Sequence, residues 1–317
     1  MSNSKTLLEK RIIETQIKFL NKGVDEKGYL KSDDPQDNLI EPFSNWEQIA
    51  NELNEGACDE LKSHGGKPNF LAVHSSSALC VNTFAPFKEH CKKLDGVLTY
   101  PDMEEPPGFD KAKFGKQLPT GLDETPPPLD FYLGNKTVTM GIVSKFTEYF
   151  DKKAPNHPTE SEQNNLEPYR DRKKLYYLPK EFQENIIEHY FHDDSPQHLD
   201  VAQLIKHAIG LLKHRRNKIP RKKAVLVYLY WEPLNCKTLY TQQRLHWDHW
   251  ETLHPNTPFV EHHRNIREFE RRMSQFKRFI DFVPVPYPDF WKLYADDDLL
   301  KDHIRKVRDR YEFEIEL

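Results

Sequence analysis

Residues 128–150 carry the feature that most constrains the fold of this chain, two short apolar segments separated by a tight turn. Residues 129–133 are apolar and aromatic, and residues 137–143 are rich in β-branched side chains, as β-strands are. The intervening Gly-Asn-Lys at 134–136 is typical of a turn, because glycine and asparagine tolerate the positive φ of a short hairpin. The sequence therefore predicts a β-hairpin.

The predicted hairpin carries an acid on one strand, Asp130, and a lysine at the end of the other, Lys145. If the turn is centred on residues 135–136, Asp130 lies opposite Gly141. Alternation of side chains then places Asp130, Val143 and Lys145 on one face. An acid and a lysine on one face can build a site for a metal ion and a water, or they can form an ordinary salt bridge at the end of a sheet.

The remaining chain alternates helical and extended patterns, which predicts an α/β fold with a mixed central sheet and helices on both sides. The run at 223–231 is unbroken by polar residues other than its first lysine, as in a central strand covered on both faces. Helices are expected at residues 4–21, 44–61, 78–94, 179–192, 200–213, 257–280 and 288–310, and further strands at 96–100, 223–231 and 282–285.

Two polar segments interrupt this predicted domain. Residues 101–128 contain seven prolines and are expected to form an extended loop. Residues 151–173 have almost no apolar side chains and are expected to be a mobile insertion. We expect an N-terminal helix and loop at residues 1–43, followed by a single α/β domain at residues 44–317.

The charge balance restricts how this chain can contact a polyanion. A net charge of −4 argues against a general basic coat, so nucleic-acid binding would need a local patch. The best candidate is residues 213–223, with seven Lys and Arg in eleven positions, in which Arg215, Arg216 and Lys218 would contact phosphates. The alternative is that these cations only favour the end of a helix.

Targeting and metal-binding signals are weak. The N-terminal residues carry charges where a signal peptide needs an apolar run, and no uncharged stretch approaches the ~20 residues of a membrane span. We therefore expect a cytoplasmic protein that does not enter a membrane. His246 and His249 have i, i+3 spacing, and His254, His262 and His263 follow, but aromatic packing is favoured over a zinc site because no CxxC or HExxH pattern supports one.

The order helix, strand, hairpin, helix, strand resembles the core of the PD-(D/E)xK nuclease superfamily. Asp130 stands where that superfamily has the acid of its PD pair, and Val143-Ser144-Lys145 stands in place of the (D/E)xK triplet. Four segments across residues 45–295 are similar to a bacterial family of restriction endonucleases: HSSSALCVN (74–82), LDFYL (129–133), SKFTEY (144–149) and YLYWEP (228–233).

This resemblance implies a restriction-endonuclease-like core that hydrolyses DNA with Mg²⁺ or Mn²⁺. Asp130 would be the central metal ligand, and Glu60 would complete the metal site from the end of a helix. Lys145 would orient the attacking water or stabilise the phosphate, and Glu148 would turn back into the site. Each of these residues also has an ordinary structural interpretation, as a solvated charge or a salt-bridge partner.

The resemblance also implies contacts to DNA near the serine-rich segment. His74, Ser76 and Asn82 would hold substrate phosphates, because a helix that begins with serines offers hydroxyls and free N–H groups to anions. Simple helix capping is the competing interpretation for Ser75. Cutting both strands with one site per chain would require two chains, and a homodimer is one assembly that would supply them.

One position departs from the family pattern. The triplet there begins with Glu, whereas this chain has Val143, and an aliphatic side chain cannot bind Mg²⁺, which takes oxygen ligands. Three interpretations remain open. Glu148 or Glu60 replaces the missing acid; the site binds one metal weakly and cuts slowly; or the protein is a catalytically inactive DNA-binding or defence-system protein derived from a nuclease.

Overall fold

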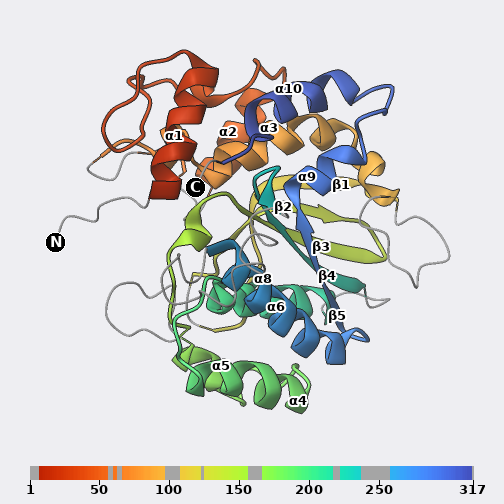
Figure 1. The fold of residues 1–317 in the computed structure, drawn as a ribbon. Helices are drawn as coiled ribbons and strands as arrows, with labels where there is room; N and C mark the ends of the chain where they lie inside the picture. Colours follow the sequence, from red (N-terminus) through yellow and green to blue (C-terminus); the bar gives the residue numbers. More distant parts are fainter. Residues whose placement is uncertain are drawn as a thin grey trace.

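The computed structural model describes residues 7–55, 60–62, 66–96, 108–122, 125–155, 166–216, 222–236 and 258–315. A five-stranded mixed sheet in the order β1-β2-β3-β4-β5 forms its centre, and helices cover both faces (Figure 1). This confirms the predicted fold class. β1 (Lys111–Gln117), β2 (Pro128–Gly134) and β3 (Val138–Lys145) are antiparallel neighbours, and β4 (Lys223–Tyr230) and β5 (Ile280–Pro286) continue the sheet parallel to β3.

The helices form two layers (Figure 1). One layer contains α1 (Leu7–Leu20), α2 (Trp46–Asn54), α3 (Ser76–Glu89), α9 (Tyr287–Lys292) and α10 (Lys301–Tyr311). The other contains α4 (Lys180–Phe182), a π-helical segment (Gln183–Glu188), α5 (His189–His192), α6 (Val201–Arg216) and α8 (Pro258–Met273). Short 3₁₀ helices lie at Pro35–Asn38, Asn69–Leu71, Cys91–Gly96, Glu148–Phe150, Glu167–Arg170 and Ser274–Phe276.

The position of β4 between two buried faces explains why its sequence is apolar at successive positions. Val225 and Val227 pack into the core beneath the α3 layer, which we call the first core. Leu226 and Tyr228 point the other way, into the core beneath α6 and α8, which we call the second core. Because consecutive side chains alternate between two buried faces, a strand of this kind has no polar face.

The hairpin forms as predicted, but the predicted pairing of Asp130 with Gly141 is wrong. Gly141 pairs with Tyr132, so the register is displaced by two residues. The cause is the Asn135 side chain, whose Oδ1 accepts hydrogen bonds from the N–H groups of Thr137, at 2.8 Å, and Val138, at 2.7 Å. These bonds lengthen the turn toward Val138 and shift its centre along the chain.

Several predicted boundaries are also wrong. The loop expected at 101–128 contains β1, an edge strand whose three lysines hid it, since charged residues commonly protect sheet edges. The insertion expected at 151–173 contributes Leu166 and Tyr169 to the second core. The helix expected at 44–61 ends at Asn54. The strand expected at 96–100 lies outside the described residues except for its first position.

The N-terminal helix packs on the same body as the sheet. α1 contacts α10, and Leu8 and Ile12 belong to the first core. The buried Arg310 of α10 donates a hydrogen bond to Gln16 Oε1 at 2.9 Å. Within the described part of the chain, no helix combines the length and the apolar character needed to cross a membrane.

Candidate active site

The backbone changes course at Asp130, where β2 separates from β3. Leu129 and Tyr132 both contribute to the second core, although strict alternation would place them on opposite faces. Across the strand, Gly115 has a φ of +59° and lies between the residues that pair with Phe131 and Leu129. This local distortion frees the Asp130 side chain from simple alternation. Its Oδ2 accepts a hydrogen bond from the Ser144 N–H at 2.8 Å, so a carboxylate joins the ends of the two strands.

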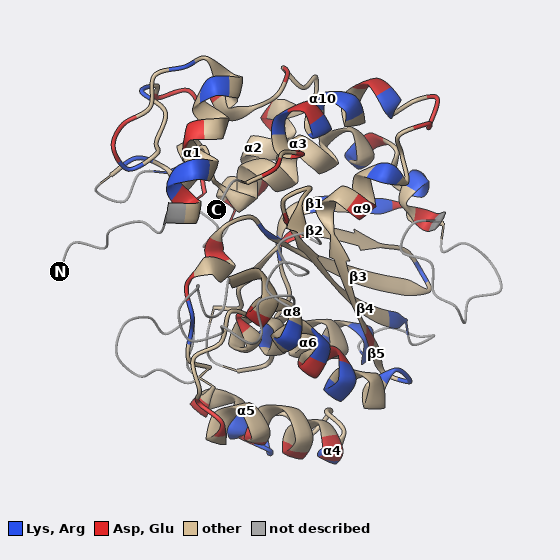
Figure 2. Ribbon diagram, viewed as in Figure 1, with Lys and Arg blue, Asp and Glu red and all other residues tan. Residues whose placement is uncertain are grey.

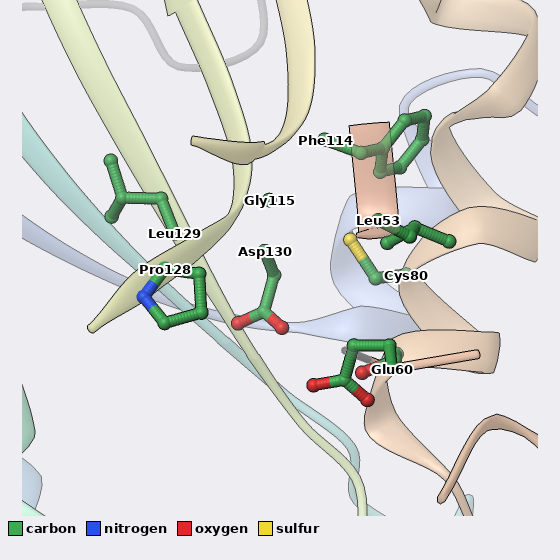
Figure 3. Close-up of a pocket in the computed structure, with 9 residues that line it drawn as sticks. Leu53, Glu60, Cys80, Phe114, Gly115, Pro128, Leu129 and Asp130 are labelled. Atoms are coloured by element: carbon green, nitrogen blue, oxygen red, sulfur yellow. The ribbon is translucent and has the colours of Figure 1, made fainter. Parts of the chain in front are cut away.

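A second carboxylate, Glu60, faces Asp130. It lies in the turn after α2 rather than on that helix, which corrects the predicted placement. Figure 3 shows the two carboxylates turned toward the same space, between the start of β2 and the helix that carries Cys80. The cavity that they line has a volume of about 20 Å³, enough for about one water or one ion.

Lys145 and Glu148 lie at the end of β3. Lys145 is buried, with 9% of its surface exposed, and its charge favours the ionised forms of Asp130 and Glu148, but its Nζ has no carboxylate oxygen of a described residue within 4.0 Å. The predicted alternative of a salt bridge to Asp130 is therefore wrong. Glu148 begins a 3₁₀ helix and folds back, so that its Oε2 accepts hydrogen bonds from the N–H groups of Phe146, at 2.8 Å, and Thr147, at 3.1 Å.

The start of α3 supports both glutamates. Ser75 caps the helix, and its hydroxyl accepts a hydrogen bond from the Ala78 N–H at 3.2 Å, as the capping interpretation predicted. The next two serines act on the carboxylates: Ser76 stabilises ionised Glu148, and Ser77 stabilises ionised Glu60. The helix start thus supplies hydroxyl donors to the acids of the site.

The pKa values of the carboxylates reflect their burial and the charges close to them. Burial raises the pKa of Asp130 to about 7, while the charge of Lys145 and the Ser144 N–H act in the opposite direction. Burial also raises the pKa of Glu60. Burial opposes the ionisation of Glu148, but the charge of Lys145 and several hydrogen bonds outweigh it and lower its pKa. Asp130, Glu60 and Glu148 repel one another, so a nearby cation would stabilise their ionised forms.

Sequence reasoning missed a neighbouring acid. Asp200 lies with Lys145 and Glu148 on a second small cavity, of about 10 Å³. Its side chain accepts a hydrogen bond from the Gln203 N–H at 3.0 Å, which caps α6, and lies 2.9 Å from Lys153 Nζ. The sequence signal was an aspartate directly before the apolar stripe of a helix. Burial opposes the ionisation of Asp200, but Lys153 and Lys145 outweigh it and lower its pKa.

Val143 does not reach the carboxylates. Its side chain is fully buried and packs in the second core. A buried apolar side chain of the second core therefore occupies the position at which the family has the triplet acid.

The residues predicted to contact DNA do not form one surface. Asn82 is fully buried, and its amide donates hydrogen bonds to Asn38 O, at 3.0 Å, and Tyr311 Oη, at 2.9 Å. The prediction for Asn82 is wrong, because a side chain so enclosed ties segments of the fold together and cannot touch DNA. His74 is half-buried, with its Nε2 3.7 Å from Glu9 Oε1. Ser76 alone of the three lies beside the acids.

Of the basic run at 213–223, the described residues 213–216 and 222–223 lie at the opposite end of the sheet. α6 leads into β4, so its C-terminus lies beside the start of that strand, about 24 Å from Asp200 for a helix of 16 residues. Arg215 donates a hydrogen bond to Lys222 O at 2.6 Å, and Arg216 lies over the Tyr176 ring. Lys218 is outside the described residues. Figure 2 shows Lys and Arg interspersed with Asp and Glu on α1, α8 and α10.

Comparison with models of known protein families finds a match. The model of a family described as restriction endonuclease associating with ARP matches residues 15–312, nearly the whole chain. No curated protein and no solved structure matches. The matched range includes every residue of the carboxylate site.

Proposed function

We propose that this chain, which belongs to the family of restriction endonucleases associating with ARP, hydrolyses phosphodiester bonds of DNA in a reaction that depends on Mg²⁺ or Mn²⁺. The observation that carries the proposal is the group of Asp130, Glu60, Glu148 and Lys145, which lies where β2 begins and β3 ends. Family membership supports a nuclease, and the side chains support the chemistry.

The residues present fit a hard divalent cation. Asp130 and Glu60 offer carboxylate oxygens on one small cavity, which are the donors that Mg²⁺ and Mn²⁺ prefer. Two protein carboxylates are enough, since Mg²⁺ usually keeps several waters. When bound, such an ion neutralises charge on the phosphate and lowers the pKa of a water. The raised pKa values of Asp130 and Glu60 are what a site awaiting a cation would show.

The other side chains supply position and charge. Lys145 would donate hydrogen bonds to a phosphate oxygen or to the attacking water. Glu148, held by two backbone N–H groups, would accept a hydrogen bond from that water and orient it. Water is restricted by the packing of Cys80, Phe114 and Leu129 around the cavity. These roles need little movement, because backbone hydrogen bonds already hold both Asp130 and Glu148.

The same site argues against a protein that only binds DNA. Three carboxylates near a phosphate repel it unless a cation lies between them. A protein selected for binding alone would gain nothing from keeping these acids buried, where ionisation is costly. We therefore favour replacement of the triplet acid by Glu60 or Glu148 over loss of activity.

The test is cleavage of supercoiled plasmid by the purified chain with Mg²⁺ or Mn²⁺. We expect cutting or nicking that EDTA abolishes and that Asp130→Asn and Lys145→Ala each reduce by about 100-fold or more. Lys136→Ala, in the turn at the far end of the same hairpin, is the matched control and should cut normally. Absence of cleavage of any DNA by correctly folded protein would refute the enzymatic proposal.

A further inference from the structure

A second group of metal-binding side chains lies apart from the carboxylate site. Glu232, Cys236 and His263 bring a carboxylate oxygen, a thiol sulfur and an imidazole nitrogen within 4.8 Å of one another. Glu232 and Cys236 lie just after β4, and His263 lies on α8. The group therefore joins two elements that are distant in sequence.

The segment that carries two of these donors is held by the C-terminal residues. Asn235 and Ile315 exchange two hydrogen bonds, from Asn235 Nδ2 to Ile315 O at 2.8 Å and from the Ile315 N–H to Asn235 Oδ1 at 3.1 Å. The Leu234 N–H donates to Phe313 O at 3.0 Å. Cys236 is buried, so its sulfur has a defined position.

The third donor is positioned through its neighbour on α8. His262 is buried, stacks on the Tyr149 ring at a centroid distance of 4.0 Å, and lies 2.8 Å from Tyr228 Oη. These contacts fix the rotation of α8 and direct His263 toward β4. His263 Nε2 then lies 2.9 Å from Glu232 Oε2.

We propose that Glu232, Cys236 and His263 bind a transition-metal dication of the zinc class. Thiolate and imidazole are typical ligands of such ions and poor ligands of Mg²⁺. Zinc lies about 2.3 Å from sulfur and 2.0–2.2 Å from nitrogen or oxygen, so small shifts let these three donors surround one ion. Binding replaces the proton between His263 and Glu232 and releases the proton of the Cys236 thiol, while water takes the fourth position.

The location indicates what the ion would do. Tyr230 pairs with Lys145, and the next N–H, that of Trp231, donates to Lys145 O at 2.8 Å. An ion bound at Glu232, the residue after Trp231, would fasten the end of β4 to α8. It would thereby stabilise the strand end that supports Lys145. This is a structural role, separate from the hydrolysis proposed for the carboxylate site.

The test is titration of the metal-free full chain with Co²⁺, followed by absorption spectroscopy, and with Zn²⁺, followed by metal analysis. We expect one equivalent of Co²⁺ with a thiolate-to-cobalt charge-transfer band. Cys236→Ser should lose that band, while Cys91→Ser, which alters another thiol, should keep it. Glu232→Gln and His263→Asn should retain the fold and weaken binding about tenfold or more.

Other outcomes contradict the inference. If Co²⁺ binds without a charge-transfer band, or if Cys236→Ser keeps the band, this cluster is only an ion pair beside a core cysteine. Circular dichroism checks the fold of each variant. An Asp130→Asn background removes the carboxylate site from the titration, so the result does not depend on whether the chain cleaves DNA.

Discussion

At the scale of single residues, the main result is that the fold buries a carboxylate, Asp130, where its ionisation is unfavourable. Asp130 is buried beside Glu60 and Glu148, and its pKa of about 7 means that ionisation costs free energy in the folded chain. The Ser144 N–H and the charge of Lys145 offset part of that cost. Strained ionisation of this kind is common at functional sites, where a substrate or a cation later relieves it.

Asp130→Asn should therefore stabilise the metal-free protein in a pH-dependent way. The pKa of Asp130 in the folded chain, about 7, lies above its unfolded value near 3.8. Protonated Asp130 therefore contributes stability below about pH 4, and this contribution is lost as the pH rises to about 7. The gain of the Asn variant over wild type should grow across that window to roughly 4 kcal/mol. Urea unfolding with EDTA between pH 4 and 8 measures it. The matched variant Asp298→Asn should show no such growth, and a gain for Asp130→Asn that does not change with pH would contradict the argument.

At the scale of elements, β3 has two functions along its length. Its central residues, Val143 among them, belong to the cores, and its last two residues, Ser144 and Lys145, reach the site. The start of α3 meets that strand end, with Ser144 Oγ donating to Ser76 O at 3.1 Å. The site is thus built from the ends of elements, where some side chains and backbone groups take part in neither strand pairing nor core packing.

The burial of Val143 predicts the effect of restoring the triplet acid. Val143→Glu should not create or increase cleavage, because the carboxylate would enter the second core without a partner. We expect it to destabilise the fold by about 3 kcal/mol or more, against about 1–3 kcal/mol for Val143→Ala. Urea unfolding and the plasmid assay measure the two effects. A stable Glu variant with faster cleavage would show that this position does reach the metal.

At the scale of the whole molecule, both candidate sites lie at one edge of the sheet. The ends of β3 and β4 are adjacent because the strands are parallel, and they bring the carboxylate site and the cluster at Glu232, Cys236 and His263 to that edge. The basic end of α6 lies at the other edge, beside the hairpin turn. Contacts from that patch to DNA would therefore lie far from the carboxylate site.

If the carboxylate site cuts DNA as proposed, the presence of one such site among the described residues predicts how double strands are cut. One chain should nick one strand, and cleavage of both should require a second chain. Nicked circles should therefore dominate at low protein concentration, and the linear product should rise more steeply than in proportion to concentration. Plasmid cleavage over a hundredfold range of concentration measures this. Linear product that appears without a nicked intermediate at every concentration would point to two sites in one chain or to a preformed dimer.

The sequence by itself determined the parts that depend on local patterns. The hairpin, the buried central strand, the serine-capped helix and the α/β class follow from periodicity, turn residues and capping residues. The resemblance to the PD-(D/E)xK superfamily then gave Asp130 and Lys145 their candidate catalytic roles. The tertiary structure alone decided the register of the hairpin, the enclosure of Asn82 and Val143, the separation of the basic run from the acids, and the approach of Glu60 and Asp200. These outcomes depend on which surfaces pack together, and contacts between residues far apart in a chain leave no periodic signal within it.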